Sequence, residues 1–271
     1  MKISIKNLLS AAAIGSVVLF VASACGDKAT FDAVTAADGA RVKFLHAIIN
    51  PAFANTAANY GQPRITVYAN DKKFSAFLNT STTAVDSMFY SNLYPSLDYA
   101  VLPAGATKFN VKQLTLFPGT PKDTTLLSFD VNLEANKYYT IIGADSVTKA
   151  KGFAITDDRS ALKNALKSYV RFVNVGSGAP GVYEFYLRRQ ASTTTLLSTV
   201  KYGEAGAYVE IDPYPLTASP AINDSIFIRI PGQTTNFIAL NLGSIFAANR
   251  IRTLVLSGTQ ARPLVNSFPN N

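Results

Sequence analysis

Two stretches of the chain share one pattern: RVKFLHA at Arg41–Ala47 and YVRFVNV at Tyr169–Val175. In both, an apolar residue stands at every second position, which places the apolar side chains on one face of an extended strand. Each stretch therefore predicts a β-strand. Because the two stretches lie far apart and resemble each other, they also indicate a repeated unit.

Two further pairs of segments follow in the same order in each half of the chain. ITVYAND (Ile65–Asp71) resembles YEFYLRR (Tyr183–Arg189), and ANKYYTII (Ala135–Ile142) matches ANRIRTLV (Ala248–Val255) at the alanine, the asparagine, the basic residue and the threonine. The common order predicts a duplicated domain.

Other short segments have the same strand character, because they are rich in aromatic and β-branched residues and end at Pro, Gly, Asn or Asp; examples are TKFNVKQ, TTLLSFDVN and DSIFIRI. We expect an all-β protein with two tandem antiparallel Ig-like β-sandwich domains, at residues 40–155 and 168–271. Between them, TDDRSALKNALKS has the capping and composition of a short helix, so residues 156–167 are expected to be a helical connector. LEANKYYT resembles the turn before a tyrosine corner at Tyr139, and Arg252 stands at the matching position of the second unit.

The N-terminal residues have the layout of a secretory signal peptide, residues 1–24. Lys2 and Lys6 make a positive start, and the uncharged stretch from Leu8 to Ala24 is short for a membrane span. The only cysteine of the 271 residues, Cys25, follows directly. VASAC at Val21–Cys25 resembles a bacterial lipobox, in which the thiol is acylated and the chain is cut before the cysteine.

This pattern predicts a lipoprotein anchored by acyl chains such as palmitate at Cys25. The small and polar residues 25–39 are then a flexible tether. Gly26 rather than an aspartate follows the cysteine, which favours the outer membrane, with the domains on its periplasmic or cell-surface side. Two alternatives stay open: an ordinary signal peptide that contains a cysteine, and a buried free thiol.

Several of these segments resemble the bacterial domain-of-unknown-function family four-three-nine-seven. The resemblance lies in ARVKFLHA, ITVYAND, YAVLPAG (Tyr99–Gly105) and NKYYTIIG (Asn136–Gly143), and it covers most of residues 40–260. It implies an exported or lipid-anchored protein with tandem domains, and it implies no particular activity.

The charge distribution favours a solvated surface over a nucleic-acid site. The chain has 25 Lys and Arg against 17 Asp and Glu, but charged residues make up only 15% of it, below the roughly 25% of typical domains. The basic residues are scattered, with Lys72-Lys73 and Arg188-Arg189 as the densest pairs. We therefore expect no nucleic-acid partner.

Patterns that suggest catalysis have simpler structural interpretations. GSGAPG at Gly176–Gly181 spells the glycine spacing of a dinucleotide site, but a strand rather than a helix is predicted after it, which favours a hairpin loop. His46 is the only histidine, and it matches Asn174 of the second unit, so we expect it to hydrogen-bond backbone at a strand end. The doublet Asp157-Asp158 suits a helix cap or linker better than a pair of catalytic acids. We expect no enzyme, no cofactor and no metal site.

Sugar binding is the most reasonable alternative function, because exposed aromatic rings stack on sugar faces. The chain has no Trp. Aromatic residues in irregular loops are the candidate ligand residues, and loop packing is the competing interpretation; they are Phe53, Tyr60 and Tyr214.

Asp-Ser or Asp-Thr followed by an apolar residue or Thr occurs four times, as DSM, DTT, DSV and DSI. This resembles an O-glycosylation sequence of exported proteins in some Gram-negative bacteria. Only surface-exposed copies qualify as acceptors, because a glycan is bulky and solvated; the candidates are Ser87, Thr124, Ser146 and Ser225.

Together these features predict a lipid-anchored cell-envelope protein that acts as a non-enzymatic structural or interaction module. The expected partners are the outer membrane, through the lipid anchor, and an unknown envelope protein or glycan. A glycan-binding surface lipoprotein is the alternative.

Overall fold

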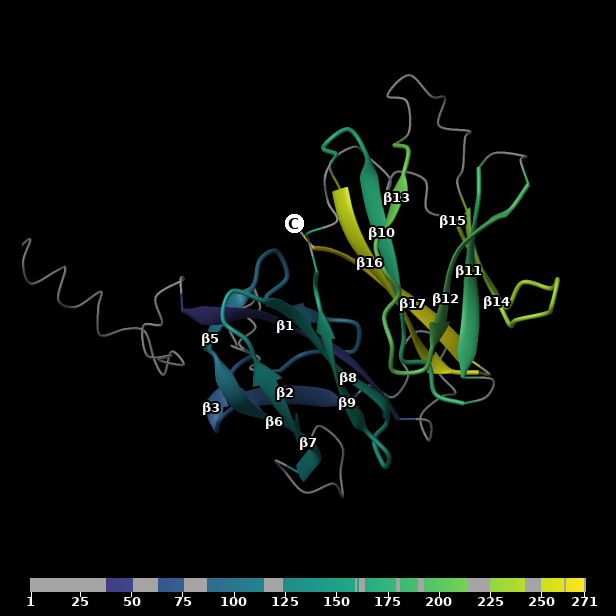
Figure 1. The fold of residues 1–271 in the computed structure, drawn as a ribbon. Helices are drawn as coiled ribbons and strands as arrows, with labels where there is room; N and C mark the ends of the chain where they lie inside the picture. Colours follow the sequence, from purple (N-terminus) through teal and green to yellow (C-terminus); the bar gives the residue numbers. More distant parts are fainter. Residues whose placement is uncertain are drawn as a thin grey trace, which may run out of the picture. The chain divides into compact units, whose positions relative to one another are not determined.

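The structure is a computed structural model, and it describes residues 38–50, 63–75, 87–114, 124–158, 160, 164–178, 181–189, 193–213, 225–241, 250–260 and 262–270. Within these ranges every regular element is a β-strand. The expected all-β class is therefore confirmed (Figure 1).

The strands form four sheets, which we name A to D. Sheet A contains β1 (Gly39–Ile49), β4 (Leu93–Tyr94), β5 (Ala100–Pro103), β8 (Tyr138–Ser146) and β9 (Lys151–Thr156). Sheet B contains β2 (Arg64–Ala69), β3 (Lys72–Lys73), β6 (Gly105–Leu114) and β7 (Thr124–Leu133). Sheet C contains β10 (Ser168–Asn174), β13 (Val209–Ile211), β16 (Arg250–Thr259) and β17 (Arg262–Pro269). Sheet D contains β11 (Val182–Arg188), β12 (Thr195–Lys201), β14 (Ser225–Arg229) and β15 (Ile238–Asn241).

The two halves of the chain have the same strand order. Sheet A runs β5-β1-β8-β9, with the short β4 pairing with β1 on the same edge as β5, and sheet C runs β13-β10-β16-β17. Sheet B runs β3-β2-β6-β7 and sheet D runs β12-β11-β14-β15. The registers also agree, since Arg41 pairs with Tyr138 on β8 and Tyr169 pairs with Ile251 on β16. We call residues at matching register positions equivalent.

Sheets C and D enclose one apolar core, built from alternate residues such as Phe172 of β10, Phe185 of β11 and Ile226 of β14. Figure 1 shows the two sheets as separate layers of the second half. Sheets A and B also face each other. Gly152 on β9 lies so close to the ring of Phe129 on β7 that a Cβ there would approach it to 2.5 Å.

Strands β1 and β10 are buried on both faces, not on one. Leu45, Ala47 and Ile49 of β1 belong to an apolar cluster with Val173 of β10 and Phe268 of β17. The alternate residues of β1 point to the opposite face, toward sheet B. Sheet A therefore packs against sheet B on one side and contributes to a shared cluster with sheet C on the other.

The expectation of purely antiparallel sheets is wrong at the centre of sheets A and C. β1 pairs in parallel with β8, and β10 pairs in parallel with β16. A parallel pair needs a long crossover between its strands, and here the crossover contains the facing sheet. Parallel strands are also typically covered on both faces, as β1 and β10 are.

The expected helical connector at 156–167 is not seen. Among its described residues, Asp158 Oδ1 accepts a hydrogen bond from Ser160 N at 2.9 Å, and Asn164 Oδ1 accepts one from Leu166 N at 2.9 Å. These side chains close local turns, which compete with helical hydrogen bonding. Asn164 N also donates to Tyr169 Oη at 2.9 Å, which ties the segment to β10.

The predicted tyrosine corner is present, because Glu134 N donates to Tyr139 Oη at 3.1 Å.

A reciprocal pair of residues fills the same space in the two halves. In the first half a Cβ added to Gly143 would lie 3.4 Å from Ile48 Cδ1. In the second half, Gly176 is equivalent to Ile48 and Leu256 is equivalent to Gly143, so the large and the small residue have changed places. A Cβ on Gly176 would lie 3.5 Å from Leu256 Cγ. Each half therefore places one large aliphatic side chain over one glycine.

Candidate binding site

A buried polar cluster lies between sheets A and C, and it consists of two equivalent sets of four residues. We call it the seam cluster: Lys43, Tyr99, Thr140 and Asp157 from the first half, and Arg171, Tyr208, Thr253 and Asn270 from the second. In each set the cation lies over the tyrosine ring: Lys43 Nζ is 4.2 Å from the Tyr99 centroid, and Arg171 Cζ is 4.9 Å from the Tyr208 centroid.

Each cation also reaches the last strand of the other half. Arg171 forms an ion pair with Asp157 and donates to Thr156 O at 2.9 Å. Lys43 Nζ donates to Pro269 O at 3.2 Å. The two halves are thus linked by reciprocal contacts. In each contact, the cation of one half binds the C-terminal end of the edge strand of the other half.

The polar atoms of the seam cluster are mostly paired with one another. Asp157 Oδ2 accepts hydrogen bonds from Tyr99 Oη at 2.7 Å and from Thr140 Oγ1 at 2.8 Å. Arg171 Nε donates to Thr253 Oγ1 at 2.9 Å. Burial raises the pKa of Tyr99, and the adjacent Asp157 charge raises it further.

The seam cluster is closed to a substrate. Lys43, Asp157 and Arg171 are at most 2% exposed. Although it unites a carboxylate, two cations and two phenols, its geometry supports a structural role that links the halves rather than a catalytic one.

His46 and its equivalent Asn174 make the same contacts in their own halves. His46 Nδ1 accepts from Ile48 N at 3.2 Å, and Nε2 donates to Pro63 O at 2.7 Å. Asn174 Oδ1 accepts from Gly176 N at 3.2 Å, and Nδ2 donates to Gly181 O at 3.3 Å. Pro63 and Gly181 each directly precede the first strand of the facing sheet, so both side chains connect two sheets.

The His46 imidazole is neutral at physiological pH, because burial lowers its pKa from 6.5 to about 4. With both ring nitrogens bonded to backbone, it has the structural role that the sequence predicted.

The GSGAPG segment leads from β10 of sheet C to β11 of sheet D, so the expected hairpin is wrong: these two strands pair with other strands and not with each other. Val175 N and Ser177 N donate to Leu256 O and Gly258 O, each at 2.8 Å, and strand β11 rather than a helix follows.

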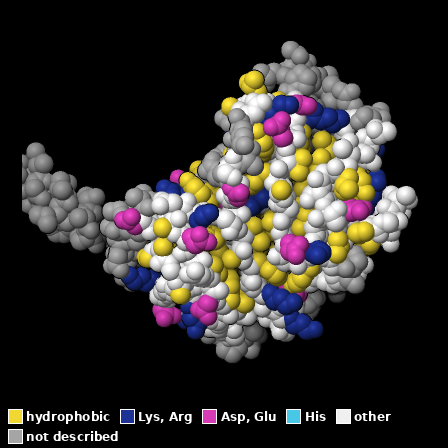
Figure 2. Space-filling view, viewed as in Figure 1, with side chains coloured by type: hydrophobic (Ala, Val, Ile, Leu, Met, Phe, Trp, Pro, Cys, Tyr) yellow, Lys and Arg dark blue, Asp and Glu magenta, His cyan; other side chains and the backbone are white. Residues whose placement is uncertain are grey.

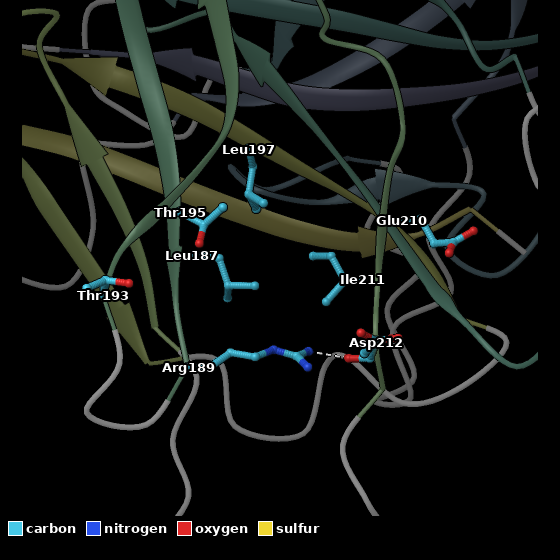
Figure 3. A pocket seen from close by; sticks show the side chains of 8 residues that line it. All are labelled: Leu187, Arg189, Thr193, Thr195, Leu197, Glu210, Ile211 and Asp212. Carbon is cyan, nitrogen blue, oxygen red and sulfur yellow. Dashed lines mark hydrogen bonds between the residues drawn. The ribbon is translucent and has the colours of Figure 1, made fainter.

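A pocket of about 270 Å³ opens at one end of the second half, between β11, β12 and β13. Figure 3 shows its apolar floor, where Leu187, Leu197 and Ile211 point toward one another. The rim carries the polar and charged side chains, namely Arg189, Thr193, Thr195, Glu210 and Asp212. Its volume lies slightly below the roughly 300–1,000 Å³ of typical small-molecule sites.

The two carboxylates of this rim are bound to the same cation. Lys167 Nζ forms an ion pair with Asp212 and lies 3.6 Å from Glu210 Oε1. The hydrogen bond from Lys167 lowers the pKa of Asp212. Both rim carboxylates are thus already engaged in an ion-pair cluster with Lys167.

Many of the residues that the sequence singled out lie outside the described residues: Cys25, Phe53, Tyr60 and Tyr214. Of the glycosylation candidates, Ser87 is 1% exposed, so its hydroxyl does not meet the requirement for surface exposure. Thr124 is exposed at the start of β7, and Ser146 and Ser225 are half-buried at the ends of β8 and β14.

Among the described residues, no group of three or more His, Cys, Asp or Glu is placed to hold a metal ion. The same residues include no helix of the length and apolarity that crossing a bilayer requires. Figure 2 shows basic and acidic side chains scattered singly and in small groups over the visible face.

The chain matches the family described as Domain of unknown function (DUF4397) over residues 40–184. The chain belongs to this family. The DUF4397 match begins at the second residue of β1, covers the rest of sheets A and B, and extends through β10 into β11. No curated protein matches the chain.

Three solved structures from Bacteroides species are distantly similar to this DUF4397 chain. A candidate cell adhesion protein from Bacteroides uniformis is 13% identical over 85% of this chain and 97% of its own, with a TM-score of 0.28. One from Bacteroides fragilis is 11% identical over 86% and 98%, with a TM-score of 0.25. A candidate adhesin from Bacteroides ovatus is 12% identical over 80% and 88%, with a TM-score of 0.22. At TM-scores this low, the likeness carries no argument about fold or function.

Sequence reasoning missed the seam cluster, although a signal was present. Lys43 and Arg171 occupy the same place in the motifs RVKFLHA and YVRFVNV, between two apolar residues. A cation at that place in both copies fits a shared buried position as well as a solvated face.

Proposed function

We propose that this DUF4397 chain is a lipid-anchored outer-membrane protein that acts as a non-enzymatic interaction module. In this proposal residues 1–24 are a signal peptide, Cys25 carries the acyl chains, and residues 25–39 are the tether. Two tandem Ig-like β-sandwich domains follow, at 40–155 and 168–271, and the repeated strand order of the two halves supports that division.

The observation that carries the proposal is the lipobox-like segment Val21–Cys25, which contains the only cysteine of the chain. Acylation there stabilises membrane attachment by about 0.8 kcal/mol per buried methylene, and more than one chain makes the attachment durable. The structure adds that His46, Asp157 and Arg171, the groups best suited to catalysis, are committed to buried structural contacts.

Labelling with an alkyne analogue of palmitate in cells that express the full chain tests the proposal. The parent should incorporate the label and sediment with the outer membrane, and Cys25→Ser should lose both properties. Ser23→Ala is the matched control, because it keeps a small residue before the cleavage point and should behave like the parent. A Cys25→Ser variant that is labelled and retained like the parent would refute the lipoprotein assignment.

Protease shaving of the same cells, followed by mass spectrometry of the released peptides, assigns the face of the membrane. Peptides from residues 40–270 that are released from intact cells indicate the cell surface. Release only after the outer membrane is opened indicates the periplasm. The same peptides report glycosylation at Thr124, Ser146 or Ser225 as a mass increase.

Glycan binding is the second candidate function, and one surface favours it. On sheet D, Leu196 is 49% exposed and pairs directly with Tyr186. An exposed apolar side chain beside an aromatic ring is a suitable platform for the C–H face of a sugar.

A further inference from the structure

The outer face of sheet D carries a row of apolar side chains that crosses three strands. Leu196 on β12 pairs with Tyr186 on β11, and Tyr186 pairs with Phe227 on β14. Their chain neighbours Phe185 and Ile226 belong to the core between sheets C and D. Because side chains alternate along a strand, the row faces away from that core.

Two arginines lie over the rings of this row. Arg188 Cζ is 4.7 Å from the centroid of Phe227, and Arg229 Cζ is 4.5 Å from the centroid of Tyr186. Phe227 is only 5% exposed beneath this cover, whereas Arg188 itself is exposed. A guanidinium held over a ring loses less conformational freedom when it binds a ligand, and its planar N–H donors suit a carboxylate.

The charge of this face is positive. Among the described residues, Arg188, Arg229 and Lys201 project from β11, β14 and β12, and Glu184 is the acid beside them. The Glu184 carboxylate accepts a hydrogen bond from Tyr186 Oη at 2.7 Å, and Arg229 donates from Nε to Asn236 Oδ1 at 2.8 Å. Three cations against one carboxylate still leave a net positive charge. The face therefore complements an anionic ligand.

The equivalent face of sheet B has a different composition. Two of its cations lie over rings, since Lys112 Nζ is 5.0 Å from the Tyr68 centroid and Arg64 Cζ of β2 is 4.4 Å from the Phe89 centroid. Asn110 stands where sheet D has Phe227, and Lys73 stands where sheet D has Leu196. Sheet D thus differs by its apolar row and by Arg188, whose equivalent in sheet B is Asn70.

We propose that the outer face of sheet D binds an acidic polysaccharide, one that carries carboxylates on its sugar rings. The C–H face of a sugar packs on Leu196 and the edge of Tyr186, and its carboxylate accepts charge-assisted hydrogen bonds from Arg188 and Arg229. This inference rests on the second candidate function and names its ligand class and its residues.

An anionic lipid surface would complement the charge but not the shape. Binding at a membrane interface requires a broad apolar face that enters the acyl region. Here Leu196 is the large apolar side chain exposed on the row, and Phe227 is covered. The observations therefore favour a glycan over a bilayer.

Calorimetric titration of the purified full chain in neutral detergent tests the inference with two probes. Polygalacturonate offers the carboxylates, and its methyl ester offers the same sugar faces without the charge. The parent should bind polygalacturonate at least about tenfold more tightly than the ester, because a charge-assisted hydrogen bond is worth more than about 1.4 kcal/mol. Affinity for polygalacturonate should fall as salt rises.

Variants assign the binding to sheet D. Arg188→Gln and Arg229→Gln should each weaken polygalacturonate binding about tenfold, and Leu196→Ser should weaken both probes equally. Lys112→Gln is the matched control, because it removes the equivalent cation of sheet B and should leave binding unchanged. Thermal unfolding of each variant shows that the fold is retained.

Three outcomes would overturn the inference: equal affinity for the two probes, an equal loss with Lys112→Gln, or tighter binding to phosphatidylglycerol vesicles than to polygalacturonate. Palmitate labelling at Cys25 is independent of all three. A labelled protein that ignores polygalacturonate removes only this inference, whereas an unlabelled protein that binds it removes only the lipid anchor.

Discussion

The two halves of the molecule share one framework but use different chemistry at its most buried polar positions. In the seam cluster, the second-half cation Arg171 meets the carboxylate Asp157, whereas the first-half cation Lys43 meets the carbonyl of Pro269. The residue equivalent to Asp157 is the neutral Asn270, which donates to Tyr208 Oη at 2.9 Å. Equivalent buried positions thus hold polar groups of different charge in the two halves.

Different residues also make equivalent contacts where a strand end meets the facing sheet. His46 and Asn174 differ in size and chemistry, yet each accepts from the backbone N–H two residues later and donates to the carbonyl before the facing sheet. Apolar packing shows the same kind of exchange, with Ile48 over Gly143 in the first half and Leu256 over Gly176 in the second. Four experiments test how far the halves are interchangeable.

The largest effect is expected from Asp157→Ala. It leaves the guanidinium of Arg171 buried without its anion, which costs about 3–5 kcal/mol of the free energy of unfolding. In a chain of this size that corresponds to a fall in Tm of roughly 10 °C. Urea and thermal denaturation measure it. The control Asn270→Ala removes the equivalent neutral side chain and should cost only about 1 kcal/mol; equal losses would contradict the different roles of the two positions.

The next effect is a pH dependence of the free energy of unfolding that comes from His46 and has no counterpart at Asn174. Its pKa falls from 6.5 to about 4 on folding, so the unfolded chain binds the extra proton between these values. The stabilisation is complete above pH 6.5 and is lost as pH falls toward 4, by about 2 kcal/mol at pH 5. His46→Asn, which installs the group of the second half, should remove this part of the pH dependence. Parallel stability curves for the parent and the variant from pH 8 to pH 4.5 would refute it.

A double-mutant cycle examines the reciprocal packing. Gly143→Leu alone overpacks the space beside Phe44, whose Cζ lies 3.0 Å from the added Cβ, and beside Ile48, and it should cost about 1–3 kcal/mol. Ile48→Gly alone leaves a cavity. The double variant imitates Gly176 and Leu256, so its loss should be smaller than the sum by about 1–2 kcal/mol. Strict additivity in urea denaturation would show that the two halves do not tolerate the same exchange.

The smallest effect is expected from Lys43→Arg, which gives the first half the cation of the second. The Oδ1 atom of Asn270 is buried without a hydrogen-bond partner, and Asn270 directly follows Pro269, whose carbonyl accepts from Lys43. An arginine has more donors than a lysine, so we expect a change within about 1 kcal/mol and toward higher stability. A loss of several kcal/mol would show that the two cation positions are not equivalent in shape.

Much of the strand pattern was predictable because it depends on local alternation. The motifs RVKFLHA and YVRFVNV coincide with β1 and β10, and the tyrosine corner at Tyr139 and the loop character of GSGAPG follow from the residues alone. The helical connector was wrong because Asp158 and Asn164 bind nearby backbone groups, and a capping pattern does not reveal which backbone group a side chain selects.

Of the candidate site residues, some could be predicted from the sequence and others could not. The structural role of His46 was predictable from its match with Asn174. The row Leu196, Tyr186 and Phe227 was not, because these residues are far apart in the chain and become neighbours only through the register of β11, β12 and β14.

The sequence by itself determined that the chain is built from β-strands in two similar halves, since alternation and internal likeness are local properties of the residues. It also determined the position of the only cysteine. Only the tertiary structure decided that β1 and β10 pair in parallel with β8 and β16 and are buried on both faces. It likewise decided that Lys43 and Arg171 are internal, because the second face of a strand is covered by a sheet from the other half, and no local pattern specifies that contact.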